Sequence, residues 1–126
     1  MKIVSFNINS IRARPHQIEH LRDTIDPDII GLQETKVNDP DFPVEMINEI
    51  GYHAEYWGQK GHYGVAILSK VKPLNTVKGF IDDSEEDQKR FIQSTHKLGS
   101  QEIVIMNGYF PHCLLYTSDA ADEGLG

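Results

Sequence analysis

Hydrophobic and polar residues alternate along Lys2–Ile8, and this pattern predicts a β-strand. The alternate positions Val4, Phe6 and Ile8 would share one face of that strand. A continuous apolar run fills most of Asp28–Gln33 and is typical of a buried strand. Both predicted strands run from apolar residues into polar ones, so both are expected to end at a polar edge of a sheet.

The segment between these strands has the spacing of a helix. Apolar or long side chains recur every three or four residues, which predicts a helix over about Arg14–Thr24 with Pro15 in its first turn. Asp26 and Pro27 then end it. A strand, a helix and a second strand in this order predict a parallel pair joined by a right-handed crossover.

The rest of the chain predicts one short helix and several more strands, so the fold class is α/β. The helix is Val44–Ile50, closed by Gly51. The extended segments are Tyr52–Trp57, Val65–Ser69, Pro73–Phe80, Arg90–Thr95 and Glu102–Asn107. The first two of these flank the glycine-rich segment Gly58–Gly64 and are expected to form a hairpin.

Composition limits the function classes. The 126 residues make one domain or part of one, with 39% hydrophobic and 25% charged residues, as in ordinary globular proteins. The net charge of −7 argues against a general polyanion binder but hides any local basic patch. The single cysteine, Cys113, cannot form an internal disulfide, and no apolar run is long enough to cross a bilayer. We therefore expect no membrane association and a location in the cytoplasm.

Candidate chemistry lies where three predicted strands end. Asn7 and Glu34 follow two of them, and Asn107 with Tyr109 follows a third. If these strands share a sheet in similar orientation, a carboxylate, amides and a phenol converge, a set that suits Mg²⁺ and a phosphate. The alternative is that strand ends are simply where polar residues reach solvent.

Basic and aromatic residues elsewhere are weaker candidates. Lys60 and His62 could donate to a ligand and Tyr63 could pack on a sugar or base, but a hairpin turn needs glycines in any case. Arg12 precedes the first helix and could bind an anion, or it could be a solvated helix end. Arg90 follows an acidic block and could simply pair with it.

Five motifs together resemble the amino-terminal half of the bacterial exonuclease III family, which are apurinic/apyrimidinic endonucleases of the endonuclease/exonuclease/phosphatase superfamily. They occur in the family's order, and the resemblance that they carry extends over Met1–Pro111. The motifs are Ser5–Asn9, Arg12–Pro15, Leu32–Lys36, Gly58–Ala66 and Asn107–Pro111.

The resemblance implies a fold and an activity. The fold would be the amino-terminal half of a two-sheet α/β sandwich, a mixed sheet with flanking helices, incomplete here, with each half of the full domain supplying one sheet. The activity would be DNA repair by hydrolysis of phosphodiesters with Mg²⁺, or Mn²⁺ in its place. The substrates would be duplex DNA with abasic sites, cut on their 5′ side, and duplex 3′ ends, trimmed as a 3′–5′ exodeoxyribonuclease. The full-length protein would be a monomer.

The resemblance also implies residue roles. Glu34 matches the metal-binding glutamate, Asn7 the asparagine that supports metal and scissile phosphate, and Tyr109 the catalytic tyrosine near that phosphate. The positions matching the DNA-binding face are Arg12, Lys60, His62, Tyr63 and Arg90.

Two departures from the family's pattern change the expectation. The family's Gly-Asp-X-Asn and Ser-Asp-His motifs do not occur in this sequence. Residues 1–111 would therefore be the amino-terminal part of the domain, and the chain a truncated, inactive copy. Residues 112–126 have no clear periodicity and are expected to be a non-native or disordered tail, resembling translated adaptor sequence from Cys113 onward.

Two other functions remain open at this point. The superfamily includes phosphatases of inositol phosphates and phosphodiesterases of lipids, although the Arg12 and Gly58–Tyr63 motifs favour the DNA branch. The chain could also be a half-domain that binds duplex DNA without cutting it, against which the net charge argues.

Overall fold

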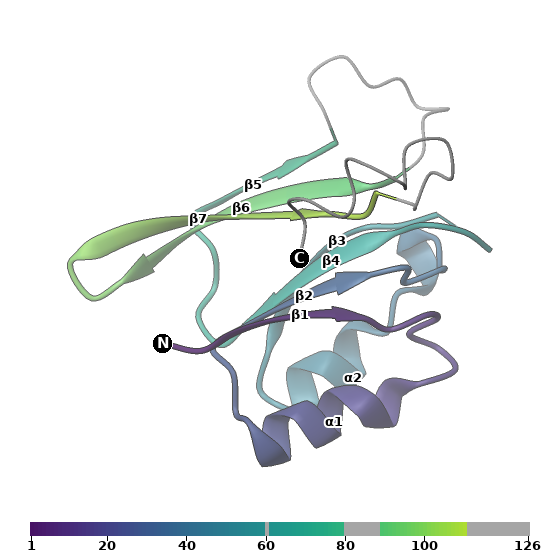
Figure 1. Cartoon of the computed structure of the whole chain (residues 1–126), viewed down its shortest axis with the longest axis horizontal. Helices are drawn as coiled ribbons and strands as arrows, with labels where there is room; N and C mark the ends of the chain where they lie inside the picture. Colours follow the sequence, from purple (N-terminus) through teal and green to yellow (C-terminus); the bar gives the residue numbers. More distant parts are fainter. Residues whose placement is uncertain (60, 80–88, 111–126) are drawn as a thin grey trace, which may run out of the picture.

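The computed structural model describes residues 1–59, 61–79 and 89–110, and these form three layers (Figure 1). A four-stranded sheet lies in the middle, helices cover one of its faces, and a three-stranded sheet covers the other. The elements are β1 (Ile3–Asn7), α1 (Pro15–Thr24), β2 (Ile29–Gln33), the 3-10 helix η1 (Asp39–Asp41), α2 (Val44–Glu49), β3 (His53–Trp57), β4 (Val65–Ser69), β5 (Asn75–Lys78), β6 (Phe91–Leu98) and β7 (Gln101–Gly108).

The middle sheet has the order β1-β2-β4-β3 and is mixed, as the sequence predicts. β1 and β2 are parallel, with Asn7 beside Gln33, whereas β4 runs antiparallel to both of its neighbours. The parallel pair and the β3–β4 hairpin are therefore confirmed.

The second sheet corrects one expectation. β5, β6 and β7 form a separate antiparallel sheet, so this part of the chain contributes strands to two sheets, and the expectation of one sheet per half is wrong. The physical reason lies in β2 and β4, whose residues are buried on both faces. Strands of that kind need a covering layer on each side. The strands that follow β4, which are β5, β6 and β7, form the second covering layer.

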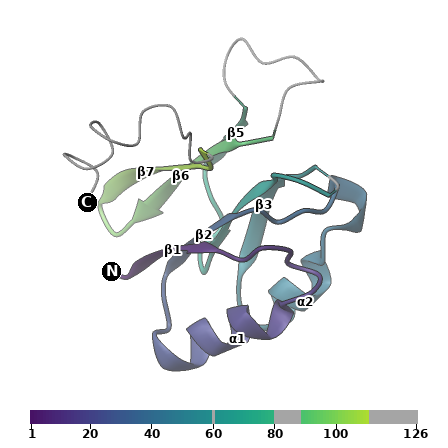
Figure 2. The same ribbon diagram turned by 45° about the vertical axis from the view of Figure 1, so that its right-hand side comes forward.

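Two hydrophobic cores follow from this layering, which Figure 2 shows from a second direction. One lies between the middle sheet and the helices and includes Ile18 of α1, Ile47 of α2 and Ile30 of β2. The other lies between the two sheets and joins Ile67 of β4 to Ile92 of β6. Alternate residues of the same strands serve the two cores, and this fixes which face each polar residue at a strand end can occupy.

The boundaries differ from prediction mainly in the second sheet. β6 and β7 continue to Leu98 and Gln101, which pair directly, so the hairpin is longer than the predicted strand ending at Thr95. Lys60, the acidic block at residues 82–87 and the tail at residues 112–126 lie outside the described residues. Within the described part, no helix is long and apolar enough to cross a membrane.

The outward face of β7 carries exposed apolar side chains. Val104 is 49% exposed and Met106 is 67% exposed, and Phe110 beyond the strand is 65% exposed. The inward-facing Ile105 packs instead against the core between the sheets. β7 therefore has one face buried and one face apolar but uncovered by the described residues.

Candidate active site

The Asn7 amide contacts the Glu34 carboxylate at the end of the parallel pair. Asn7 Nδ2 donates a hydrogen bond of 2.8 Å to Glu34 Oε1, and Asn7 Oδ1 accepts one of 3.0 Å from the backbone N–H of Asn9. These two bonds fix which end of the amide faces the carboxylate. Asn7 therefore orients the Glu34 carboxylate through Nδ2, while Asn7 Oδ1 is bound to the backbone of the loop after β1.

Lys36 is a further member of this cluster that sequence reasoning did not single out. Its Nζ lies 3.7 Å from Glu34 Oε2 and donates a 2.6 Å hydrogen bond to Asn9 Oδ1. The side chains of Lys36 and Glu34 are 28% and 22% exposed, so water screens this contact only in part. The signal available in the sequence was its place two residues after Glu34, in the same motif.

Tyr109 brings a phenol to the same carboxylate from the second sheet. Burial raises the pKa of Tyr109, and the charge of Glu34 and a side-chain hydrogen bond with Glu34 raise it further. The Tyr109 backbone N–H donates to Arg90 O at 2.8 Å, and the Tyr63 ring lies 6.2 Å from the Tyr109 ring at a 55° tilt. The phenol is therefore held protonated at neutral pH, as a hydrogen-bond donor.

Left-handed backbone conformations gather around this cluster. Such conformations are uncommon for residues with a side chain and are often found at functional sites. Five non-glycine residues near the cluster have positive φ: Asn9 (47°), Ser10 (84°), Glu34 (55°), Lys36 (58°) and Tyr63 (55°). Asp26 also has positive φ (53°), in the turn before β2 and away from the cluster.

Backbone hydrogen bonds between three loops hold these conformations in place. Ser10 N–H donates to Glu34 O at 2.8 Å, and Lys36 N–H donates to Tyr63 O at 2.9 Å. Thr35, fully buried between them, donates its N–H to Gly64 O at 3.1 Å. The loops after β1 and β2 and the loop before β4 thus form one unit that points Glu34 outward from the sheet edge.

Asn107 does not join the cluster that the sequence predicted for it. It is 6% exposed and lies between the sheets, where its Nδ2 donates to Leu32 O at 2.9 Å and to Ala66 O at 2.8 Å. The reason is strand alternation, which places Asn107 on the inward face of β7. Of the predicted strand-end groups, Asn7, Glu34 and Tyr109 meet, and Asn107 lies beneath them.

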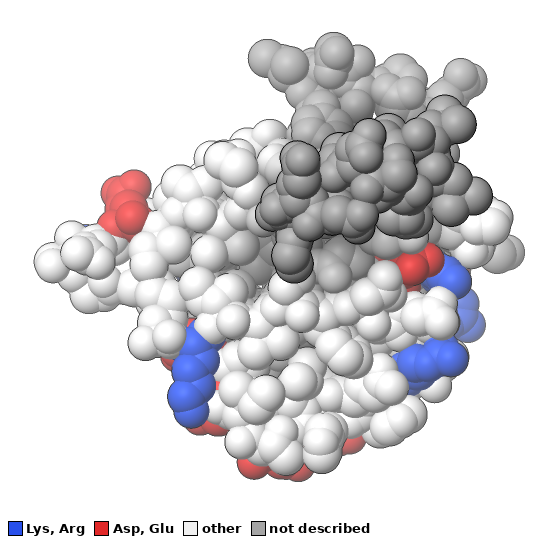
Figure 3. Space-filling view, in the orientation of Figure 1, with Lys and Arg blue, Asp and Glu red and all other residues white. Residues whose placement is uncertain are grey.

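The described residues among those predicted to face DNA lie around this edge. Arg12 is exposed in the turn before α1, and His62 is exposed with its ring 6.1 Å from that of Tyr63. Arg90 is half-buried, 5.9 Å from the Phe110 ring, and Lys60 is outside the described residues. Figure 3 shows basic side chains beside an acidic one at the end toward which β1 and β2 run, on a face that is otherwise mostly uncharged.

The donor set can be compared with the needs of a metal ion. The described residues contain no group of three or more His, Cys, Asp or Glu side chains that could hold one. Mg²⁺ needs less, because it keeps several waters and often takes one or two protein carboxylates together with substrate phosphate. The oriented and partly exposed Glu34 carboxylate fits that mode.

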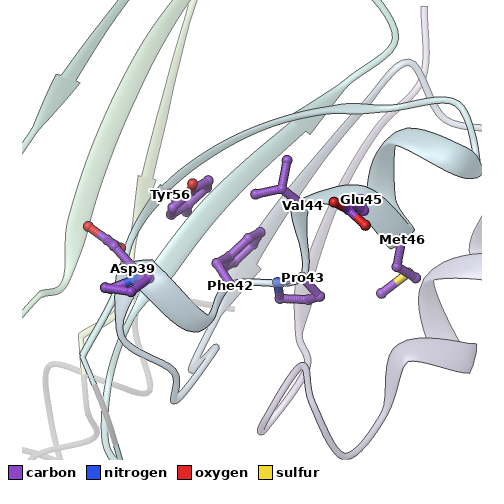
Figure 4. A pocket seen from close by; sticks show the side chains of 8 residues that line it. Asp39, Phe42, Pro43, Val44, Glu45, Met46 and Tyr56 are labelled. Atoms are coloured by element: carbon purple, nitrogen blue, oxygen red, sulfur yellow. The ribbon is translucent and has the colours of Figure 1, made fainter.

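The larger of the two hollows described lies elsewhere (Figure 4). It has a volume of about 640 Å³ and contains none of the clustered residues. Its lining is Asp39, Pro40, Phe42, Pro43, Val44, Glu45, Met46 and Tyr56. Phe42 and Tyr56 stack there with ring centroids 4.1 Å apart. We place the candidate active site at Glu34 because the oriented polar groups converge there and not in this hollow.

Comparison with known proteins gives consistent matches. Residues 4–103 match the model of the Endonuclease/Exonuclease/phosphatase family. Exodeoxyribonuclease III of Haemophilus influenzae is 50% identical over 111 residues, which cover 88% of this chain and 42% of that protein. The exodeoxyribonuclease of Bacillus subtilis is 32% identical, over 89% of this chain and 43% of that protein. The chain thus spans about two fifths of the length of these relatives.

Two solved structures share the fold at substantial identity. An AP endonuclease from Archaeoglobus fulgidus matches with a TM-score of 0.75 and 38% identity, over 86% of this chain and 40% of that one. The 3′ phosphatase NExo from Neisseria, bound to a product DNA hairpin, matches with a TM-score of 0.72 and 32% identity, over 82% of this chain and 40% of that one.

Proposed function

This chain belongs to the endonuclease/exonuclease/phosphatase family, and on that premise we propose that it is the amino-terminal part of a DNA repair nuclease. The reaction would be hydrolysis of DNA phosphodiesters with Mg²⁺, or with Mn²⁺ in its place. The substrates would be duplex DNA with abasic sites, cut on the 5′ side, and duplex 3′ ends. The names of the similar proteins support nuclease chemistry on DNA.

One observation carries the proposal. A carboxylate directly after β2, an amide at the end of β1 and a phenol beyond β7 meet at one sheet edge, although they come from three separate parts of the chain. Glu34 would hold the metal ion, which neutralises charge on the phosphate when it is bound. Asn7 would hold the Glu34 carboxylate in the orientation that this requires.

Tyr109 has a distinct role in this proposal. Its protonated phenol would donate to a phosphate oxygen, where negative charge grows as water attacks phosphorus. Arg12, Lys60, His62, Tyr63 and Arg90 would contact the DNA around the scissile bond. Where these residues contact DNA phosphates, they would position the duplex without reading its sequence. This suits a repair enzyme that acts at lesions and ends.

The decisive experiment restores the missing part of the domain. Residues 1–111 are joined to the segment of Haemophilus influenzae exodeoxyribonuclease III that follows its matching region. We expect the chimera to nick an abasic duplex and to shorten a duplex with a recessed 3′ end in Mg²⁺ but not in EDTA. Glu34→Gln should abolish both activities. A chimera that folds yet cleaves neither substrate would refute the proposal.

The chain by itself provides the complementary test. Lacking the remaining motifs, the 126-residue protein should not nick abasic DNA. Mg²⁺-dependent nicking by the purified chain, removed by Glu34→Ala, would show that this expectation is wrong. A gel shift at low salt that disappears at higher salt, with no product strand, would instead indicate a non-catalytic DNA-binding half-domain.

A 3′-phosphatase is the second candidate. The observation in its favour is the similarity to NExo, whose structure holds a product DNA hairpin. The chimera is therefore also given a duplex ending in a 3′ phosphate and, as a non-nucleic-acid substrate, an inositol polyphosphate. Release of inorganic phosphate from the DNA but not from the inositol polyphosphate would favour a DNA 3′-phosphatase over the superfamily's small-molecule phosphatases.

A further inference from the structure

Asn107 is a polar residue in the inward-facing row of β7. On the same side, Ile105 of β7 and Tyr109, directly after the strand, pack against the core between the sheets. A side-chain amide buried among apolar groups is destabilising unless its hydrogen bonds are made. At 6% exposure, Asn107 must therefore find its partners within the protein.

Its partners lie in the other sheet. Asn107 Nδ2 donates to Leu32 O and Ala66 O, which belong to directly paired residues of β2 and β4. Asn107 Oδ1 accepts a 2.7 Å hydrogen bond from Gln33 Nε2. The amide thus uses both its donor and its acceptor ends to join β7 to the middle sheet.

Gly31 provides the space for this contact. A Cβ atom at Gly31 would lie 3.2 Å from Asn107 Cγ and 3.3 Å from Asn107 Oδ1. Contacts that short require a neighbour to move by a few tenths of an ångström. The missing side chain in β2 therefore lets the Asn107 amide approach the backbone carbonyls closely.

The hydrogen bonds form a layer directly beneath the candidate active site. Gln33 Nε2 also lies 3.1 Å from Ser5 Oγ, so the layer runs from β1 through β2 to β7. Ser5 is two residues before Asn7, and Asn107 is two residues before Tyr109. Two residues of strand span about 6.7 Å, so Ser5 lies about that far from Asn7, and Asn107 about that far from Tyr109. Gln33, which joins them, pairs with Asn7 at the level of the site.

We propose that Asn107 is a positioning residue of the candidate active site, whose bonds to β2 and β4 set where Tyr109 lies relative to Glu34. Directional hydrogen bonds fix the position of β7 relative to β2 across the two sheets. Apolar packing alone would allow a wider range of positions. The functional meaning of this placement rests on the proposed nuclease activity. The placement itself does not, so it can be tested without DNA.

A buried polar contact elsewhere in the same interface supplies a matched control. Ser94 Oγ lies 2.7 Å from His96 Nε2 on β6, and both side chains are fully buried or nearly so. Ser94 pairs with Ile105 and His96 with Ile103, so this contact lies farther from the site along the sheet. Ser94→Ala removes a buried hydrogen bond there without touching Tyr109.

The test measures, in the whole 126-residue chain, how far the Glu34→Gln substitution changes the ¹⁹F chemical shift of Tyr109. The tyrosines are replaced by 3-fluorotyrosine, and Tyr109→Phe identifies the Tyr109 ¹⁹F resonance. Glu34→Gln should shift that resonance in the parent chain. We expect the shift to fall to less than half in an Asn107→Ala background and to keep its full size in a Ser94→Ala background.

A second variant guards against loss of folding. Gly31→Ala keeps every polar group but presses a methyl group against Asn107, and it should reduce the shift in the same direction by a smaller amount. A full-sized shift in folded Asn107→Ala or Gly31→Ala would overturn the proposal. Because the readout involves no DNA cleavage, inactivity of the chimera would count against the nuclease proposal and leave this one standing.

Discussion

The Asn7 side-chain amide donates a 2.8 Å hydrogen bond to the Glu34 carboxylate, across 27 positions of sequence. The bond exists because β1 and β2 are parallel and in register, so that Asn7 lies beside Gln33, the residue before Glu34. One carboxylate oxygen is thereby held by an amide, while the other faces Lys36 at 3.7 Å.

Glu34→Gln should remove Mg²⁺ binding by the 126-residue chain. An amide cannot replace a carboxylate as the charged ligand of a hard cation. The measurement is an NMR titration that follows the Asn7 side-chain amide, which contacts Glu34 directly. Glu102→Gln, an exposed change near the start of β7, is the matched control and should leave the titration unchanged. Equal titrations for the parent and Glu34→Gln would place the ion elsewhere.

Lys36→Met should tighten Mg²⁺ binding in the same titration. The Lys36 ammonium lies near Glu34 Oε2 and competes electrostatically with a cation at that oxygen. A partly screened ion pair is worth about 0.5–1 kcal/mol, which corresponds to roughly twofold to fivefold in affinity. Lys70→Met removes a similar lysine, paired with Asp26 at 2.8 Å, and should change nothing. Weaker binding by Lys36→Met would mean that Lys36 supports the site in another way.

Tyr109→Phe in the chimera should lower kcat by about 10²–10³ with little change in KM, as expected for loss of one donor to a developing charge. Burial and Glu34 raise the pKa of Tyr109 from its ordinary value of 10.0, so the phenol stays protonated around neutral pH. Activity should therefore show no loss from tyrosine ionisation at neutral or mildly alkaline pH. Tyr52→Phe, which removes a bond to Pro27 O away from the site, is the control. Equal kcat values for the two variants would exclude the donor role.

Gly64→Ala should destabilise the chain far more than Gly99→Ala. Both glycines have positive φ, 89° and 65°, so alanine is disfavoured by about 1–2 kcal/mol at either position. Only at Gly64 would the new Cβ also collide with Thr35 Oγ1, which adds about 1–3 kcal/mol. Thermal melts of the two variants should differ accordingly. Similar Tm values would show that the loop around Thr35 moves to accommodate the new Cβ without loss of stability.

Stability should fall as the pH drops below 6.5, because of His96. Burial lowers the pKa of His96 from its usual 6.5, although the Val71 backbone and Glu55 partly oppose this. The unfolded chain then binds the proton more readily than the folded one, so stability rises with pH through this window and is complete above 6.5. His96→Gln should flatten the dependence of Tm on pH, whereas the exposed His53→Gln should not. An unchanged slope in His96→Gln would assign the effect to other groups.

Local pattern was enough to predict much of this fold and part of the site. Alternation and helical spacing located β1, α1, β2 and the β3–β4 hairpin, and the strand–helix–strand order predicted that β1 and β2 are parallel. The same reasoning brought Asn7 and Glu34 together, since parallel strands end at the same edge. The residue roles drawn from the family resemblance remain predictions.

Other features depend on contacts between distant segments. Asn107 has the same local signature as Asn7, a polar residue at the end of an apolar strand, yet it is buried between the sheets. Which face of β7 is covered depends on how the second sheet packs over the first. Lys36 was missed because its position depends on a left-handed turn held by hydrogen bonds to Tyr63 and its neighbours.

The sequence by itself determined the strands, the first helix and the polar groups that end each strand, because periodicity and turn chemistry act over a few neighbouring residues. Only the tertiary structure decided that β5–β7 form their own sheet, that Tyr109 reaches Glu34, and that Asn107 ties the two sheets together beneath them. These outcomes depend on packing one sheet against another. Which faces meet in that packing is a property of the whole set of strands.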